Sequence, residues 1–353
     1  MTGKLILEDG SSFEGKSFGA QIAAAGEAVF STGMTGYPES LTDPSYKGQI
    51  LILTYPIIGN YGVPDKKYWE SDGIKISGLI VSNYIDTPSH FQSRETLSSW
   101  LKKENIPALE IADTRFLTQK IRTKGTMLGK IVFNKDIEFY NPTLENLVAQ
   151  VSTKKIIEQG TGEKRILLID CGAKRNIERC FLKRGLTVIT VPWDFDPFET
   201  SNLHPKDAKL DFDGIIVSNG PGDPKKADKT ILTIKKALAL KIPILGVCLG
   251  NQLLALAAGG DTQKLKFGHR SQNQPCLLEG SERCYITTQN HGFTVNKIPK
   301  EFKTWFINAN DGSNEGIIHK KLPFMSVQFH PEACPGPVDT EWIFDYFLNR
   351  IKK

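Results

Sequence analysis

The chain has 353 residues, of which 40% are hydrophobic and 24% are charged, and these values are ordinary for a globular protein. The length favours two domains, since one domain holds about 150 residues. The net charge of +5 is spread along the chain with no run of more than two Lys or Arg residues, which excludes the basic patch of a nucleic-acid-binding protein. No apolar run approaches the roughly 18 residues of a membrane span, and the first ten residues are too polar for a signal peptide, so we expect no membrane partner and a cytoplasmic protein.

The first part of the chain, residues 1–151, alternates short strand patterns with helical ones and is predicted to be an α+β domain. Asp9-Gly10 is a hairpin signal. The predicted strands are Lys4–Gly10, Glu27–Thr32 and Gln49–Thr54, and the predicted helices are Ser93–Lys103, Arg115–Arg122 and Thr143–Val151. Residues 152–164 are polar and twice interrupted by glycine, which predicts a linker.

From residue 165 to 353 buried strand patterns alternate with helical ones. The strands are expected at Arg165–Asp170, Thr187–Val191, Gly214–Ser218 and Pro243–Cys248, with helices at Lys174–Arg184, Lys226–Leu240 and Leu249–Ala258. This βαβ series predicts an α/β domain with a mostly parallel central sheet flanked by helices. The functional residues of such domains lie in loops at the carboxyl ends of the strands.

Six cysteines occur without any C-x-x-C pair or zinc-type Cys/His spacing, so we expect no metal site. Cys248 differs from the others, because it lies between Gly246 and Gly250 where an apolar strand gives way to a helix. This is the cysteine version of a nucleophile elbow. The turn exposes the sulfur, and the amino terminus of the following helix favours the thiolate. The pattern therefore predicts a catalytic nucleophile, with a buried structural cysteine as the alternative.

A second strand, Phe324–Phe329, ends at His330-Pro331-Glu332. The spacing of two residues points the imidazole and the carboxylate to one side of the chain, so that Glu332 could orient His330 as a base for Cys248. His291 is a rival base. Its sequence neighbours include no orienting carboxylate, and His330 is preferred.

Two further loops contain groups suited to an amide substrate. Val217–Pro224 follows a buried strand and contains two glycines and two prolines, so that its amides, with that of Leu249, are candidates for an oxyanion hole. Thr288–Phe293 offers amide donors and an aromatic wall.

These segments resemble a known family. In order and spacing, Ser218–Pro224, Gly246–Gln252 and Gln328–Glu332 are similar to class I (triad) glutamine amidotransferases over about 165–353. The first half resembles the amino-terminal domain of the small subunit of carbamoyl phosphate synthetase, at Thr32–Tyr46, Thr54–Asn60, Asp113–Thr118 and Gly125–Met127. The resemblance covers essentially the whole chain.

The resemblance implies a glutaminase that passes ammonia to a large subunit, which makes carbamoyl phosphate from bicarbonate and ATP for arginine or pyrimidine biosynthesis, or both. No cofactor is expected on this chain, and ATP and Mg are expected on the large subunit. The implied catalytic triad is Cys248, His330 and Glu332. The implied glutamine contacts are Ser45, Gly220, Gly222, Leu249, Gln252, Asn290, Gly292 and Phe293, and Ser45 implies a site near the domain interface. Asn251 departs from the family, since many members have His there.

Three alternatives remain. An amidotransferase that feeds a different synthase would share the chemistry, but the Thr32–Tyr46 segment argues against it. A cysteine peptidase would need an open groove, whereas Gln252 and the Asn290–Phe293 loop indicate a closed amide pocket. An inactive scaffold is disfavoured by the intact Cys248, His330 and Glu332.

Overall fold

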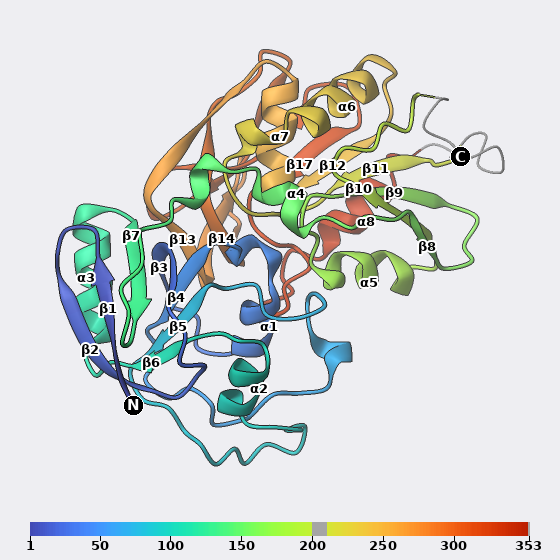
Figure 1. Ribbon diagram of the computed structural model, residues 1–353. Coiled ribbons are helices and arrows are strands. Elements are labelled where there is room, and N and C mark those ends of the chain that lie inside the picture. The colour runs from blue at the N-terminus through green and yellow to red at the C-terminus, as the bar shows by residue number, and fades with distance from the viewer. Residues whose placement is uncertain (200–209, 352–353) are drawn as a thin grey trace. The chain divides into compact units, whose positions relative to one another are not determined.

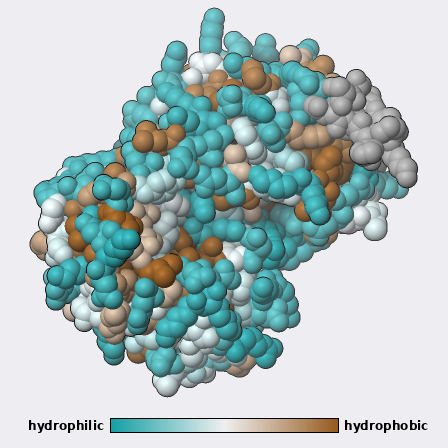
Figure 2. All heavy atoms as spheres, viewed as in Figure 1, coloured by the Kyte–Doolittle hydropathy of each residue, from teal (hydrophilic) through white to brown (hydrophobic). Residues whose placement is uncertain are grey.

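The computed structural model describes residues 1–199 and 210–351, which form two compact units (Figure 1). Unit 1 comprises residues 1–147 and 266–272, and unit 2 comprises residues 148–265 and 273–353. No helix in the described residues is long and apolar enough to cross a membrane. The face in Figure 2 is mostly hydrophilic, with hydrophobic residues in scattered groups.

Unit 1 is built on a closed seven-stranded barrel in the order β1-β2-β6-β5-β4-β3-β7. Its strands are β1 (Thr2–Leu7), β2 (Ser12–Ser17), β3 (Ala24–Ser31), β4 (Gln49–Leu53), β5 (Gly78–Val81), β6 (Ala108–Glu110) and β7 (Met127–Val132). Its α-helices are α1 (Tyr37–Thr42), α2 (Leu97–Lys103) and α3 (Thr114–Lys124). The Asp9-Gly10 turn joins β1 to β2 as an antiparallel hairpin, which confirms that prediction.

Unit 2 contains strands of a ten-stranded sheet in the order β14-β13-β15-β16-β17-β12-β11-β9-β10-β8. Five neighbours, β17, β12, β11, β9 and β10, are parallel, as predicted for this half of the chain. The strands are β8 (Ile157–Gln159), β9 (Arg165–Asp170), β10 (Thr187–Pro192), β11 (Gly214–Val217), β12 (Ile244–Val247), β13 (Asp261–Leu278), β14 (Cys284–Lys297), β15 (Phe302–Asn308), β16 (Asn314–His319) and β17 (Phe324–Val327).

Helices cover both faces of the parallel strands because alternate strand residues point to opposite sides. Ile166 and Leu168 of β9 pack in a cluster with residues of α5 (Arg175–Lys183) and α8 (Trp342–Leu348). Leu167 and Ile169 pack in a second cluster with α6 (Asp228–Ala239) and α7 (Leu249–Ala257). These two apolar layers hold the carboxyl ends of the strands, and the loops that follow them, in fixed positions. A short helix, α4 (Leu147–Val151), lies at the start of the unit.

The structure divides the chain differently from the predicted 1–151, 152–164 and 165–353. The unit boundary lies between Leu147 and Val148, and residues 266–272 from the middle of β13 belong to unit 1. The predicted linker contains β8, which pairs antiparallel with β10. All three residues of β8 are exposed, so this strand has no apolar pattern to reveal it.

Candidate active site

Cys248 occupies the sharp turn between β12 and α7. It is 1% exposed, and its φ of 55° lies in the left-handed region that L-residues rarely adopt. The flanking glycines are sterically required. A Cβ on Gly246 would lie 2.4 Å from the carbonyl oxygen of Gly250, and one on Gly250 would lie 2.1 Å from that of Val217. The elbow predicted from sequence is therefore present, with the sulfur next to the start of α7. The expectation that this turn exposes the sulfur is wrong, since Cys248 is buried.

The sulfur of Cys248 has one acceptor and one donor beside it. Its thiol donates to the carbonyl oxygen of Asn290 at 3.7 Å, and Gln328 Nε2 donates to Sγ at 3.7 Å. Both neighbours are buried. The nucleophile is therefore held between β14 and the residue that follows β17. The prediction of a loop at Thr288–Phe293 is wrong, because these residues lie within β14.

His330 and Glu332 follow β17 and form a direct contact. His330 Nδ1 lies 2.6 Å from Glu332 Oε1, and both side chains are buried. The backbone N–H of His330 donates to the carbonyl oxygen of Thr288 at 2.9 Å, which ties this segment to β14. His330 Nε2 is buried and has no hydrogen-bond partner in the described part of the chain. Glu332 thus orients the ring and leaves Nε2 available for a reacting group.

Lys174, which precedes α5, adds a positive charge to this pair. Its Nζ lies 3.2 Å from Glu332 Oε1, and its side chain is 2% exposed. Burial by itself raises the pKa of Glu332, but Lys174 and His330 outweigh it and hold the pKa at about 2. Burial lowers the pKa of His330, whereas the negative charges of Glu332 and Cys248 raise it to about 10. These charges favour the protonated imidazolium at His330.

The loop after β11 and the start of α7 supply backbone N–H groups on the same edge of the sheet. Leu249 is the first residue of α7, and the first N–H groups of a helix have no acceptor within it. A Cβ on Gly220 would lie 2.1 Å from the carbonyl oxygen of Cys171, and Gly222 has a φ of 86°. A side chain at position 220 would clash with the backbone, and one at position 222 would be strained, so glycine is favoured at both positions.

The structure also brings together the predicted groups for amide binding within unit 2. Gln252 on α7 donates from Nε2 to the carbonyl oxygen of Phe293 at 2.9 Å. Asn290 and Gly292 lie in the same stretch of β14 as Phe293. Ser45 lies in unit 1, where its N–H donates to Asp43 Oδ1 at 2.9 Å, and its predicted contact with glutamine stays a prediction.

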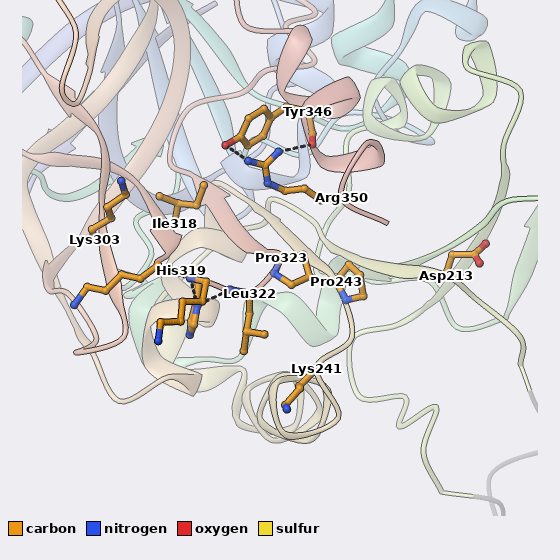
Figure 3. A pocket seen from close by; sticks show the side chains of 12 residues that line it. Asp213, Lys241, Pro243, Lys303, Ile318, His319, Leu322, Pro323, Tyr346 and Arg350 are labelled. Carbon is orange, nitrogen blue, oxygen red and sulfur yellow. Dashed lines mark hydrogen bonds between the residues drawn. The ribbon is translucent and has the colours of Figure 1, made fainter. Parts of the chain in front are cut away.

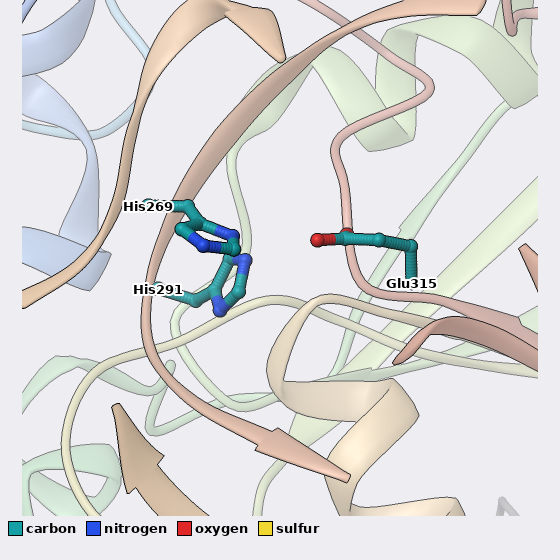
Figure 4. A group of neighbouring side chains, drawn as sticks. All are labelled: His269, His291 and Glu315. Atoms are coloured by element: carbon teal, nitrogen blue, oxygen red, sulfur yellow. The ribbon is translucent and has the colours of Figure 1, made fainter. Parts of the chain in front are cut away.

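His291, the rival base, has both ring nitrogens engaged. Nδ1 lies 2.8 Å from the carbonyl oxygen of Phe293, and Nε2 lies 3.2 Å from Gln289 Oε1. A carboxylate missed at the sequence level is nearby, because the ligand atoms of His291 and Glu315 lie within 4.8 Å of each other (Figure 4). The preference for His330 therefore depends on its unpartnered Nε2 and its contact with Glu332.

A separate pocket of about 690 Å³ lies at the opposite edge of the parallel strands (Figure 3). Asp213, Pro243 and Pro323 line it, and these residues immediately precede β11, β12 and β17. Its lining is rich in lysine and contains no cysteine. It is therefore distinct from the triad, which lies at the carboxyl ends of the same strands.

Sequence reasoning missed two buried residues beside the triad, Lys174 and Gln328. Lys174 follows β9 closely, and the position after a parallel strand was the available signal. Gln328 was noted only as part of a motif, and nothing in its spacing indicates that it contacts Cys248.

Both halves of the chain match known protein families. Residues 167–350 match the family model "Glutamine amidotransferase class-I", and residues 5–131 match "Carbamoyl-phosphate synthase small chain, CPSase domain". The chain is 48% identical over 380 residues to "Multifunctional protein pyr1-3" of Dictyostelium discoideum, covering 99% of this chain and 17% of that protein. It is 46% identical over 396 residues to "Multifunctional protein URA2" of Saccharomyces cerevisiae, covering 99% and 17%.

A human relative, "Carbamoyl-phosphate synthase [ammonia], mitochondrial", is 45% identical over 366 residues, covering 100% of this chain and 24% of that protein. The chain thus spans less than a quarter of the length of each of these three relatives. The amidotransferase model covers more than half of the chain and includes the elbow and the His-Pro-Glu segment. The chain therefore belongs to the class I glutamine amidotransferase family, with a carbamoyl-phosphate synthase small-chain domain ahead of its amidotransferase domain.

Proposed function

We propose that this chain hydrolyses glutamine to glutamate and ammonia as the amidotransferase part of a glutamine-dependent carbamoyl phosphate synthetase. One observation supports this most directly: a buried His330 held by Glu332, with an unpartnered Nε2, beside the elbow cysteine. A carbon–nitrogen bond can be cleaved by such a pair without a metal or an organic cofactor.

The reaction begins when the Cys248 thiolate attacks the side-chain amide carbon of glutamine and forms a carbon–sulfur bond. The carbonyl oxygen becomes an oxyanion, for which the N–H groups of Gly220 and Leu249 are the proposed donors. The carbon–nitrogen bond then breaks as His330 gives its Nε2 proton to the departing ammonia, which leaves a glutamyl thioester.

Water completes the cycle. His330 Nε2, now neutral, takes a proton from the water that attacks the thioester carbon. The carbon–sulfur bond breaks, glutamate leaves, and the thiolate–imidazolium pair is restored. Glu332 remains ionised throughout, because its pKa is about 2 while His330 is charged and the positive charge of Lys174 remains beside it when the ring is neutral. Its part is to orient the ring and stabilise the imidazolium.

Family membership alone does not establish glutamine as the substrate, because the human relative carries "[ammonia]" in its name. Cys248 supports glutamine as the substrate of this chain. A class I fold without a nucleophile could still bind a partner, whereas an elbow cysteine with a triad histidine and glutamate supports hydrolysis. The alternative is an amidotransferase that feeds a different synthase, and the match of residues 5–131 to the small-chain domain weighs against it.

The proposed partner is a large synthetase chain, either separate or fused to this one, that uses bicarbonate and ATP with Mg. The much greater length of the multifunctional relatives supports a fused or associated synthetase. Carbamoyl phosphate would then supply pyrimidine synthesis, arginine synthesis or both. A cytoplasmic location is part of the same proposal.

The experiment compares Cys248→Ala with Cys284→Ala, which alters an exposed cysteine, in complex with the synthetase chain. We expect Cys248→Ala to abolish glutamate release and glutamine-dependent carbamoyl phosphate synthesis, while synthesis from added ammonia continues. Cys284→Ala is expected to match the unmodified chain in both assays. Glutamate release that survives in Cys248→Ala would contradict the assigned nucleophile. Loss of the ammonia-dependent reaction as well would contradict the division of labour between the chains.

A further inference from the structure

We infer that Gln328 is a positioning residue for the nucleophile: its side-chain amide donates to the Cys248 thiolate, and Asn251 and Gln252 fix the direction of that amide. The inference rests on the proposed function and adds a residue outside the triad and outside the predicted glutamine contacts.

The first observation is burial. Gln328 and Asn251 are both 0% exposed, and Gln252 is 2% exposed. A buried amide requires partners for its oxygen and its nitrogen. The Nε2 group of Gln328 donates to Cys248 Sγ at 3.7 Å, within the range of a hydrogen bond to sulfur.

The second observation fixes the orientation of the amide. Gln328 Oε1 accepts from Asn251 Nδ2 at 3.2 Å and from Gln252 Nε2 at 3.1 Å. If the amide were flipped, its NH₂ group would face these two donors, and its oxygen would face the sulfur. Neither contact with the thiolate nor contact with the donors would then be favourable.

The donors are themselves fixed. Asn251 Oδ1 accepts from the Ser326 hydroxyl at 2.8 Å, which leaves its NH₂ group to donate to Gln328. Gln252 Nε2 donates to the carbonyl oxygen of Phe293 as well, which requires its nitrogen on this side. The chain of hydrogen bonds from Ser326 to Cys248 therefore has one consistent direction.

The two neighbours of the sulfur suit different protonation states. A thiol can donate to the Asn290 carbonyl, but a thiolate can only accept, and Gln328 is then an uncharged donor to it in addition to the charged His330. Hydrogen bonds to a charged partner are stronger than those between neutral groups. The charged groups near this site are His330, Glu332 and Lys174. A substitution in the amide network changes none of these charges. Loss of Gln328 therefore removes stabilisation of the thiolate without removing a charge.

The test uses Gln328→Met, which keeps the length of the side chain but removes the amide. The full chain is treated with iodoacetamide over a range of pH, and modification of Cys248 is followed by peptide mass spectrometry. We expect the pH of half-maximal modification to rise by about one unit, the equivalent of a tenfold loss of thiolate stabilisation. In the complex, kcat for glutamine is expected to fall about tenfold while KM changes less than threefold.

Gln289→Met is the matched control. Gln289 is also a buried glutamine that donates to a cysteine sulfur, Cys276 Sγ at 3.3 Å. Because successive residues of a strand point to opposite sides, Gln289 and its neighbour Asn290 lie on opposite sides of β14. We expect the Cys248 profile to be unchanged in this variant. A general loosening of the buried network would shift both profiles, and that outcome would overturn the inference.

If circular dichroism shows that Gln328→Met is unfolded, Asn251→Leu tests the same idea, since it removes one donor that orients Gln328. A rise in the pH of half-maximal modification, smaller than one unit, supports the inference. An unchanged profile in a folded variant contradicts it. Because alkylation needs no glutamine, its result is independent of whether glutamine hydrolysis itself is confirmed.

Discussion

Removal of the buried cation beside the triad gives a sharp test of the electrostatics of the site. Lys174→Met keeps the alkyl stem and removes the Nζ that lies 3.2 Å from Glu332 Oε1. Lys174 also donates from Nζ to the carbonyl oxygen of Ala333, so the substitution removes two contacts of the segment that carries the triad glutamate. The side chains of Lys174 and Glu332 are 2% and 0% exposed, and little solvent is present to compensate.

The magnitude follows from the pKa of Glu332. Its fall from the ordinary 4.5 to about 2 corresponds to about 3 kcal/mol in favour of the folded state. Lys174 is the larger of the two charges that lower it, so we expect the free energy of unfolding at pH 7 to drop by about 2 kcal/mol or more. The depressed pKa stabilises the fold above pH 4.5, and this stabilisation is lost as the pH falls towards 2. The difference between the variant and the unmodified chain is therefore expected to shrink over that range.

Urea unfolding measured from pH 7 down to pH 3 is the assay, with glutamate release in the complex as a second readout. Lys225→Met is the control, because Lys225 and Asp261 form an exposed ion pair at 2.7 Å. Exposed pairs contribute little, and we expect no measurable change in this variant. If Lys174→Met were as stable as the control at pH 7, or if its deficit did not decrease with acidity, the assigned role of the ion pair would be wrong.

Two further predictions concern the triad and the elbow. Glu332→Gln removes the carboxylate that contacts His330, so the pKa of His330 is expected to fall from about 10 towards its ordinary value, as NMR titration of the ring would show. The kcat for glutamate release is expected to drop at least about a hundredfold, and a kcat within threefold of the original would exclude an orienting role for Glu332. Gly250→Ala places a Cβ 2.1 Å from the carbonyl oxygen of Val217, and we expect a loss of about 1–3 kcal/mol in urea unfolding. A loss below about 0.5 kcal/mol would show that the turn can relax around the added methyl group.

Local patterns in the sequence determined much of the fold. The Asp9-Gly10 hairpin, the parallel orientation of β9, β10, β11 and β12, and the elbow at Cys248 each follow from patterns in short segments. Turn propensity, buried apolar runs and glycine spacing are properties of such short segments, and they could be predicted without knowledge of the rest of the chain. The spacing of His330 and Glu332 likewise predicted their contact, but the chain forms it through a turn and not through an extended segment, since the N–H of Ala333 donates to the carbonyl oxygen of His330 at 3.1 Å.

Only the tertiary structure decided which distant groups surround these residues. Lys174 meets Glu332 across 158 positions of the sequence, and Gln328 reaches Cys248 across 80. The exposed strand β8 and the division of β13 between the two units also lack a local signal. The physical reason is the same in each case. A parallel sheet brings the carboxyl ends of separate strands together, and the residues that meet there are chosen by strand order and not by sequence spacing.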